Sequence, residues 1–453
     1  MQTPRGPQIL NVALFSGALV GLGCMLGAAF VQRTDEPEIS EDENRTLASM
    51  PELRWSAIVD GSFSTGVDEW VADHFPVRDR FMAAHFWLEE RRGFRPEQEV
   101  AFYAVEIDHD AELEPLEDEL LLDELDEIGA PLDDDLDDLE LLDDADEPGE
   151  IVKTEGILVH EGRAMQLFSG GPKGSRRYAK VINQYAEALG DEVRIYSLIV
   201  PTAQTYYLPE AYEGRVRHEP PNIAATYALM DPSVTTVDVV GALAPHVDEY
   251  IYFRTDHHWT GLGAYYAYAA FCQAAGFEPV ALAAMDKRRI ERFRGSLYRY
   301  TRDAKLRQAP DQVEYWVPEV EVEVERYLGS EQKKPYAGEL LREQSSGYGV
   351  FLGGDHPLLI ARTDRNTGRR ALVIKNSYGN AFAVYLVAHF DAVLIVDYRK
   401  FEGSVLELIE QHQITDLIII NGAITANAGF HIRRVAYVLN EGKPVRKHKP
   451  AAE

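Results

Sequence analysis

The hydrophobic pattern of the chain opens with one long apolar run. Residues from Ile9 to Val31 are almost wholly apolar and include no charged side chain. As a helix, at about 1.5 Å per residue, this run spans roughly 34 Å, enough to cross the hydrocarbon core of a bilayer. Arg5 precedes it and the acidic run Asp35-Glu36-Pro37-Glu38 follows it, which favours a cytoplasmic N-terminus with the rest of the chain outside. We therefore expect an uncleaved membrane anchor, with a cleaved signal peptide as the alternative.

From residue 151 onward, apolar runs typical of strands and of helices alternate. The run Val193–Val200 predicts a strand that ends before Pro201, and Ala264–Ala275 predicts a helix. Three shorter apolar runs, each after a plausible helix, predict further strands: Ala371–Ile374, Val393–Val396 and Leu417–Ile420. Short continuous runs of this kind are typical of parallel strands buried on both faces. The pattern predicts an α/β fold with a mostly parallel central sheet, whose functional sites lie at the carboxyl ends of the strands.

Charge separates one stretch from the rest of the chain. The formal net charge is −30, and 23 Asp or Glu with no Lys or Arg lie between Glu106 and Glu150, which leaves about −7 for all other residues. Such a stretch repels itself and favours a solvated insert. We expect four parts: the anchor over 1–34, a helical part over 35–103, the acidic insert over 104–150 and the α/β domain over 151–445. The acidity argues against nucleic-acid binding, which needs a basic surface.

The first motif with chemical potential is Arg254-Thr255-Asp256-His257-His258-Trp259-Thr260, between an extended segment and the predicted helix. An Asp-x-His spacing lets both side chains turn into one pocket, where Asp256 can fix the tautomer of His258 and stabilise its protonated form. Two histidines and a carboxylate would also suit zinc. Adjacent histidines cannot easily both bind one ion, so we expect no metal ion here, and no cofactor.

The second motif is Lys375-Asn376-Ser377-Tyr378-Gly379-Asn380-Ala381, directly after a predicted strand and before a predicted helix. A serine in this position is often only a helix N-cap. The same position also offers the helix dipole and free backbone amides to a developing oxyanion. Since serine is a weak nucleophile until a base takes its proton, His258 is the candidate base for Ser377.

Together, the two motifs resemble those of the DHHW family. The stretch Thr255–Thr260 is similar to the signature that names the family, and Lys375–Phe382 is similar to its serine block. Two further stretches fit the family, Ile39–Arg45 and Phe351–Pro357. The family in turn resembles SGNH hydrolase-like proteins of alginate and other polysaccharide O-acetylation.

By position, this resemblance implies Asp256, His258 and Ser377 as a catalytic triad on a three-layer SGNH hydrolase-like fold. His257 takes a middle position that tolerates other residues among the relatives. Many members carry Asp directly before the serine, where this chain has Asn376. An Asn replaces a structural Asp well as a hydrogen-bonding cap, but it cannot replace a catalytic one.

Four further residues are candidates for substrate binding or oxyanion stabilisation. Tyr378 and Asn380 could supply oxyanion donors. Arg254 could bind an anionic sugar, or pair with a surface carboxylate. Trp259 could stack on a sugar ring, or anchor the loop by packing.

The resemblance implies an O-acyltransferase that moves an acetyl group onto a cell-surface polysaccharide, with its main domain outside the cell membrane. Because no acetyl-CoA is present there, a multi-spanning membrane-bound O-acyltransferase would have to deliver the acetyl group. The alternatives are a carbohydrate O-acetyl esterase with the same triad, and a non-catalytic surface scaffold of the same fold. A metal-dependent phosphoesterase is less well supported, since it needs further Asp clusters on the sheet.

Overall fold

The computed structural model describes residues 62–75, 100–103, 156–327, 334–345 and 347–443, with two short strands and isolated positions between residues 16 and 58. The chain divides into two compact units, Met1–Pro96 and Glu97–Glu453. The expected acidic insert lies outside the described residues, and so does the expected anchor apart from isolated positions. Within the described ranges, no helix has the length and apolar character to span a bilayer. The anchor therefore stays a prediction.

In the first unit, the described elements are β1 (Ile39–Ser40), β2 (Arg45–Thr46) and α3 (Ser62–Asp73), and the two strands pair antiparallel. Trp70 is the buried residue of α3, and its ring stacks on that of His74 with 4.9 Å between ring centroids.

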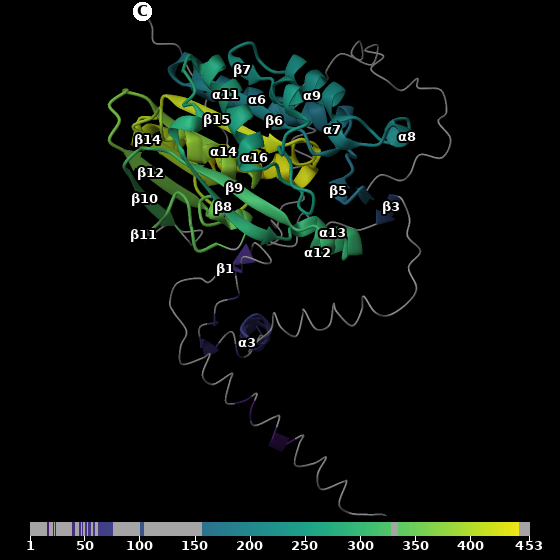
Figure 1. Ribbon diagram of the computed structural model, residues 1–453. Coiled ribbons are helices and arrows are strands. Elements are labelled where there is room, and N and C mark those ends of the chain that lie inside the picture. The colour runs from purple at the N-terminus through teal and green to yellow at the C-terminus, as the bar shows by residue number, and fades with distance from the viewer. Residues whose placement is uncertain are drawn as a thin grey trace, which may run out of the picture. The chain divides into compact units, whose positions relative to one another are not determined.

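The second unit is built on an eight-stranded sheet with the order β11-β10-β12-β14-β13-β15-β6-β7 (Figure 1). The strands are β6 (Arg194–Val200), β7 (Val234–Val237), β10 (Val322–Tyr327), β11 (Pro335–Ala337), β12 (Leu358–Thr363), β13 (Arg370–Lys375), β14 (Ala392–Asp397) and β15 (Asp416–Gly422). The strands from β14 to β7 are parallel, and β12, β10 and β11 extend the sheet in antiparallel pairing. The four strands expected from apolar runs, β6, β13, β14 and β15, are confirmed and lie side by side. The sequence did not indicate the antiparallel extension.

Both faces of the parallel strands are buried. In β13, Ala371 and Val373 belong to one hydrophobic core, whereas Leu372 and Ile374 belong to a second. Helices α10 (Val239–Leu243), α11 (Gly261–Ala275) and α14 (Tyr378–Leu386) contribute to the first core. Helices α6 (Pro172–Leu189), α9 (Glu219–Ala228), α15 (Val405–His412) and α16 (Gly429–Asn440) contribute to the second. Because successive side chains of a strand point to opposite faces, a continuous apolar strand needs helices on both sides, and the result is a three-layer α/β arrangement.

A small antiparallel sheet joins the residues on either side of the acidic stretch. It consists of β3 (Val100–Tyr103), β4 (Ile157–His160) and β5 (Arg163–Gln166), and Tyr103 pairs directly with Ile157. The second unit thus begins at Glu97, before β3, rather than after residue 103. The acidic stretch connects two strand ends that are neighbours in space.

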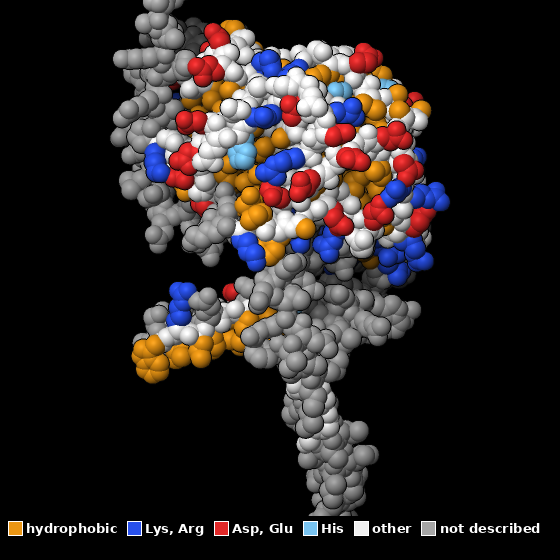
Figure 2. Space-filling model, turned by 90° about the vertical axis from the view of Figure 1, so that its left-hand side faces the viewer, with side chains coloured by type: hydrophobic (Ala, Val, Ile, Leu, Met, Phe, Trp, Pro, Cys, Tyr) orange, Lys and Arg blue, Asp and Glu red, His pale blue; other side chains and the backbone are white. Residues whose placement is uncertain are grey.

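Strands β8 (Asp286–Phe293) and β9 (Asp311–Val317) pair antiparallel, and the segment that connects them contains two short helices, α12 (Ser296–Thr301) and α13 (Ala304–Gln308). The remaining short elements are α7 (Gln204–Tyr207), α8 (Glu210–Glu213), η2 (Gly190–Glu192), η3 (Ala244–His246), η4 (Leu282–Ala284), η5 (Tyr348–Val350) and η6 (Thr425–Asn427). Figure 2 shows that, on one face of the described part, basic and acidic side chains are interspersed rather than gathered by sign. This face offers no continuous basic surface to nucleic acid.

Candidate active site

The Asp-His-His loop is a tight turn that is fixed on both sides. Tyr252 and Trp259 pair across it in an antiparallel bridge. The Asp311 carboxylate of β9 accepts from Thr255 N at 2.7 Å and from Thr255 Oγ1 at 2.6 Å. After the loop, Thr260 caps α11 through its side chain. These contacts hold the two histidines between a strand-like bridge and a helix start.

Ser377 lies two residues after the end of β13 and is the N-cap residue of α14, with φ −58° and ψ −22°. Its side chain makes no capping hydrogen bond, so the hydroxyl is available to another partner. The first turn of α14 lies very close to the strand end, because a Cβ added at Gly379 would stand 2.4 Å from Cβ of Lys375. Only glycine fits there, and this close approach sets the sharp strand-to-helix turn on which the serine lies.

The structure brings Asp256, His258 and Ser377 together in one hydrogen-bonded row. His258 Nε2 lies 2.7 Å from Ser377 Oγ, and His258 Nδ1 lies 2.6 Å from Asp256 Oδ1. The second carboxylate oxygen of Asp256 accepts from Ser296 N at 2.8 Å. The distances match those expected for a nucleophile, its base and the group that orients the base.

Asp256 is held in its charged form. All three residues of the row are buried, and burial by itself opposes ionisation of a carboxyl group. The imidazoles of His258 and His257, together with hydrogen bonds from His258 and from Ser296 N, outweigh that cost and hold the pKa of Asp256 well below its usual range. At neutral pH an ionised Asp256 would stabilise His258 when this histidine takes up a proton.

Aromatic packing fixes the plane of the His258 ring. The Tyr348 ring stacks on it with 4.0 Å between centroids and an interplanar angle of 5°. The ring of His257 lies on His258 with centroids 3.8 Å apart, tilted by 38°. Tyr348 OH also donates to Ser377 O at 3.0 Å, so one tyrosine touches both the imidazole and the backbone of the serine.

Asn376 acts as a local tie for the turn that carries Ser377. Its Nδ2 donates to Thr425 Oγ1 at 3.0 Å, and its Oδ1 accepts from Tyr378 N at 3.3 Å. The side chain thus links the start of α14 to η6. The two hydrogen bonds use both the amide nitrogen and the amide oxygen, which suits Asn and indicates a structural position.

Two of the candidate binding residues are packed into the protein. Trp259 is fully buried, and its Nε1 donates to Tyr378 O at 3.0 Å. Tyr378 is also buried, and its hydroxyl donates to His257 O at 2.5 Å. Both side chains join the Asp-His-His loop to the serine turn, and of the two roles considered for Trp259 the structure favours the packed anchor.

The other two candidates lie in different surroundings. Asn380 is 1% exposed, and its Nδ2 donates to Asp355 Oδ1 at 2.9 Å. The Arg254 side chain is 44% exposed, with Nε 3.8 Å from Asp311 Oδ1, and its guanidinium lies over the Tyr250 ring at 5.2 Å. Of the four candidates, Arg254 is the one with a side chain open to a ligand.

Potential metal ligands of Asp256, His257 and His258 lie within 4.8 Å of one another. In this structure, however, these groups are engaged elsewhere. Both ring nitrogens of His258 contact the row described above, and His257 Nδ1 lies 2.6 Å from Ser296 Oγ. An ion bound by all three side chains would have to displace either Asp256 or Ser377 from a ring nitrogen of His258, so the residues fit the hydrogen-bonded row better than they fit a metal.

Three residues that hold this site were not found from the sequence: Tyr348, Ser296 and Asp311. Tyr348 lies between two glycines, which indicates a turn but not a stacking partner. Ser296 and Asp311 carry no sequence signal, since they reach the loop only through the β8–β9 hairpin. Their contribution depends on contacts across about 40 to 56 positions of sequence.

The fold and the site together define the class: an α/β protein with a serine, a histidine and an aspartate in hydrogen-bond contact at the carboxyl end of a central parallel strand. The model of the DHHW protein family matches residues 97–396. The chain belongs to the DHHW family, and its Asp256-His257-His258-Trp259 motif lies at the centre of the site.

Solved structures show the same fold. A DHHW family protein from Eubacterium siraeum is 29% identical, with a TM-score of 0.59, over 63% of this chain and 96% of that one. Bacillus cereus PatB1, solved with a sulfonyl adduct, is 17% identical with a TM-score of 0.52, over 61% of this chain and 97% of that one. PatB1 in a second structure gives 18% identity and the same TM-score. A search of curated proteins gave no significant match.

Proposed function

We propose that this protein is an extracytoplasmic serine-dependent O-acyltransferase that transfers an acyl group, expected to be acetyl, to a polysaccharide. The observation that carries the proposal is the unbroken row from Asp256 through His258 to Ser377, with contacts of 2.6 Å and 2.7 Å. Metal and cofactor are not needed for this chemistry, because a serine activated by a histidine can by itself form an acyl ester.

In the first step, Ser377 Oγ attacks the carbonyl carbon of the donor ester, and His258 Nε2 takes the hydroxyl proton. Charge then develops on the carbonyl oxygen next to the N-terminus of α14, where the helix dipole favours a negative group. The donor oxygen leaves with the proton from His258, and an acyl-serine remains. Throughout, Asp256 keeps the ring oriented and stabilises its protonated form.

In the second step, a hydroxyl group of the acceptor attacks the acyl-serine, and His258 takes its proton before returning it to Ser377. A sugar hydroxyl in this role gives transfer, and water gives hydrolysis. The alternative function, a carbohydrate O-acetyl esterase, therefore uses the same residues and differs only in the acceptor. Arg254, the exposed candidate, would contribute to acceptor binding if the polysaccharide is anionic.

The place of the protein in the cell follows from the expected anchor over residues 9–31. With the α/β domain outside the membrane, the acyl donor would come from a multi-spanning membrane-bound O-acyltransferase. The structural neighbour PatB1 supports covalent chemistry on this fold, because a sulfonyl adduct forms when a nucleophilic group attacks a sulfonyl reagent.

The test is covalent labelling of the purified protein with a sulfonyl fluoride, with the modified peptide identified by mass spectrometry. We expect a single modification on Ser377, and none in the Ser377→Ala variant. A single-turnover assay with an acetyl ester then compares transfer to an oligosaccharide with release of free acetate. Labelling that spares Ser377 would refute the proposal, and labelling that is abolished by a chelator would favour the metal alternative.

A further inference from the structure

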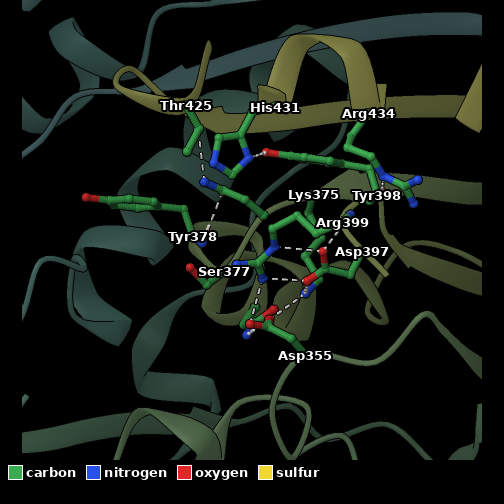
Figure 3. Close-up of polar contacts among 12 residues, drawn as sticks. Asp355, Lys375, Ser377, Tyr378, Asp397, Tyr398, Arg399, Thr425, His431 and Arg434 are labelled. Carbon is green, nitrogen blue, oxygen red and sulfur yellow. Dashed lines mark hydrogen bonds and ion pairs between the residues drawn. The ribbon is translucent and has the colours of Figure 1, made fainter. Parts of the chain in front are cut away.

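A buried cluster of four charged side chains lies beneath the turn that carries Ser377 (Figure 3). Lys375 Nζ donates to Asp355 Oδ1 and to Asp397 Oδ2, both at 2.8 Å. Arg399 Nη2 donates to Asp355 Oδ2 at 2.6 Å and to Asp397 Oδ2 at 2.7 Å. The lysine and both carboxylates are no more than 1% exposed by side chain, and the Arg399 side chain is 14% exposed. The two positive and two negative charges balance.

Such a cluster is not the most stable way to fill the inside of a protein. Removing four charges from water costs free energy, and well-packed apolar side chains often do as well or better in the same volume. The carboxylates stay ionised although burial opposes it, because Lys375 and Arg399 hold the pKa values of Asp355 and Asp397 below their usual range. Fixing local geometry is one attested role of such a cluster, and this cluster includes Lys375, two residues before Ser377.

Asp397 makes its additional contacts to Arg399, whose backbone N and Nε donate to its Oδ1, whereas Asp355 makes its additional contact to α14. Asp355 Oδ1 accepts not only from Lys375 but also from Asn380 Nδ2, at 2.9 Å. Lys375 is two residues before Ser377 in the chain, and Asn380 is three residues after it. One carboxylate oxygen therefore binds side chains from both sides of the serine, the end of β13 and the first turn of α14.

The other side-chain atom of Asn380 offers no substitute for this tie. Asn380 Oδ1 is buried and has no hydrogen-bond partner among the described residues. Within that part of the chain, Asp355 alone fixes the orientation of the Asn380 amide. Removing the Asp355 carboxylate would leave the Asn380 amide in the first turn of α14 without its described hydrogen-bond partner.

The loop directly before Asp355 has an unusual backbone conformation. Leu352, Gly353 and Gly354 have φ values of 62°, 71° and 105°. Glycine adopts such values readily, whereas Leu352 does so against a steric cost. Strained positions of this kind persist only where the surroundings fix them, and they are common at functional sites. The next residue, His356, stays neutral at pH 7, because burial and the nearby cations Arg326 and Lys375 lower its pKa to about 4, so it adds no charge to the cluster.

We infer that Asp355 is a positioning residue for the nucleophile: by joining Lys375 to Asn380, it fixes the turn so that Ser377 Oγ stays within reach of His258. The inference rests on the proposed function, and it assigns to Asp355 a part in the rate of acylation rather than in acceptor binding. Displacements of about 1 Å in a reacting group can cost roughly 10²-fold in rate, so loss of this tie has a large expected effect.

The test compares Asp355→Ala with Asp397→Ala. Each variant removes one of the two carboxylates that Lys375 and Arg399 share, and each leaves the same excess positive charge in the cluster. Only Asp355→Ala also removes the partner of Asn380. The readouts are the rate of Ser377 modification by a sulfonyl fluoride, taken per folded molecule, and the kcat and KM of acetyl-ester cleavage.

We expect Asp355→Ala to react about 10²-fold more slowly than Asp397→Ala, with the loss in kcat rather than in KM. Equal rates per folded molecule in the two variants would overturn the inference. If these variants do not fold, Asn380→Ala keeps all four charges and removes only the tie, and it should show the same loss in kcat. An Asn380→Ala variant that reacts as fast as the wild type would overturn the inference as well.

Failure of the proposed function would look different. In that case the wild-type protein and Ser377→Ala would be modified alike. If the wild type is modified at Ser377 and the two aspartate variants react equally, only the positioning role of Asp355 is refuted.

Discussion

Replacing Ser377 by alanine separates catalysis from folding more cleanly than any other single change in this site. The side chain makes no capping hydrogen bond to α14. Its described contact is the one with His258 Nε2 at 2.7 Å. Alanine keeps the Cβ and the helix start, so the structural cost comes only from the lost hydroxyl.

The expected stability change follows from that one contact. A net hydrogen bond contributes about 1 kcal/mol, and a buried group left without its partner can cost roughly 1–3 kcal/mol. His258 is 3% exposed, so its Nε2 would face the space left by the hydroxyl, and a water molecule there would lower the cost. We expect Ser377→Ala to lose about 1–2 kcal/mol of unfolding free energy, which leaves the domain folded.

The expected loss of activity is far larger. Without Oγ no acyl-serine can form, and loss of a triad member typically reduces the rate by at least ~10³-fold. The assay is single-turnover cleavage of an acetyl ester at fixed enzyme concentration, with far-UV circular dichroism and a urea titration on the same samples. A Ser377→Ala variant that is folded and still cleaves the ester within tenfold of the wild type would refute the reasoning, because the nucleophile would then lie elsewhere.

Three further predictions rest on other parts of the structure. His258→Ala should lose about as much activity as Ser377→Ala, and the two losses should not add in the double variant. His257→Ala should lose much less activity, because the hydrogen bond of His257 Nδ1 is to Ser296 rather than to Ser377. The rates of ester cleavage by these variants test both statements, and a larger loss in His257→Ala than in His258→Ala would show that His258 is not the base. Replacing residues 104–155 by a short turn should move the thermal midpoint by only a few degrees, since Tyr103 and Ile157 already pair; a collapse of the midpoint in calorimetry would show that the acidic stretch packs on the fold. Burial raises the pKa of Glu219 to about 7, although Thr205 and Thr202 donate hydrogen bonds to its carboxylate. The pKa in the folded protein therefore lies above the unfolded value of about 4.3. The stability linked to Glu219 is fully present below about pH 4 and is lost as the pH rises through 7. Urea unfolding at pH 5 and pH 8 should therefore show a smaller loss of stability with pH in Glu219→Gln than in the wild type, and parallel losses would contradict the role of this carboxyl group.

Much of the fold and part of the site could be predicted from the sequence for local reasons. Apolar runs such as Ala371–Ile374 indicate buried strands because a strand covered on both faces needs no polar position. The Asp-x-His spacing brings Asp256 and His258 together within one turn. Ser377 could be placed at a strand end because the change from a strand pattern to a helix pattern is itself local.

Other features could not be predicted because they join distant parts of the chain. The sequence left open whether the Trp259 ring faces a sugar or packs in the core. The ring packs against Tyr378, which lies 119 positions away in the sequence, and this contact could not be predicted locally. The cluster around Lys375 depends on β14 being the neighbour of β13, which brings Asp397 opposite Lys375. The local sequence pattern of β13 or of β14 does not indicate which other strand pairs with it.

The sequence by itself determined which segments become buried strands and where helices α11 and α14 lie to within a turn, although both helices start three residues earlier than their apolar patterns indicated. It also determined which side chains have the chemistry of an acid, a base and a nucleophile, since propensity, apolar pattern and side-chain chemistry act over a few residues. The tertiary structure decided the 2.7 Å contact between His258 and Ser377 across 119 positions, the stacking of Tyr348 on the imidazole and the tie from Asp355 to both sides of the serine. These contacts depend on strand order and on loop conformations such as that of Leu352–Gly354. They are fixed only when the whole sheet and its two cores have formed, because the free energy that holds them comes from packing shared by all of its strands and helices.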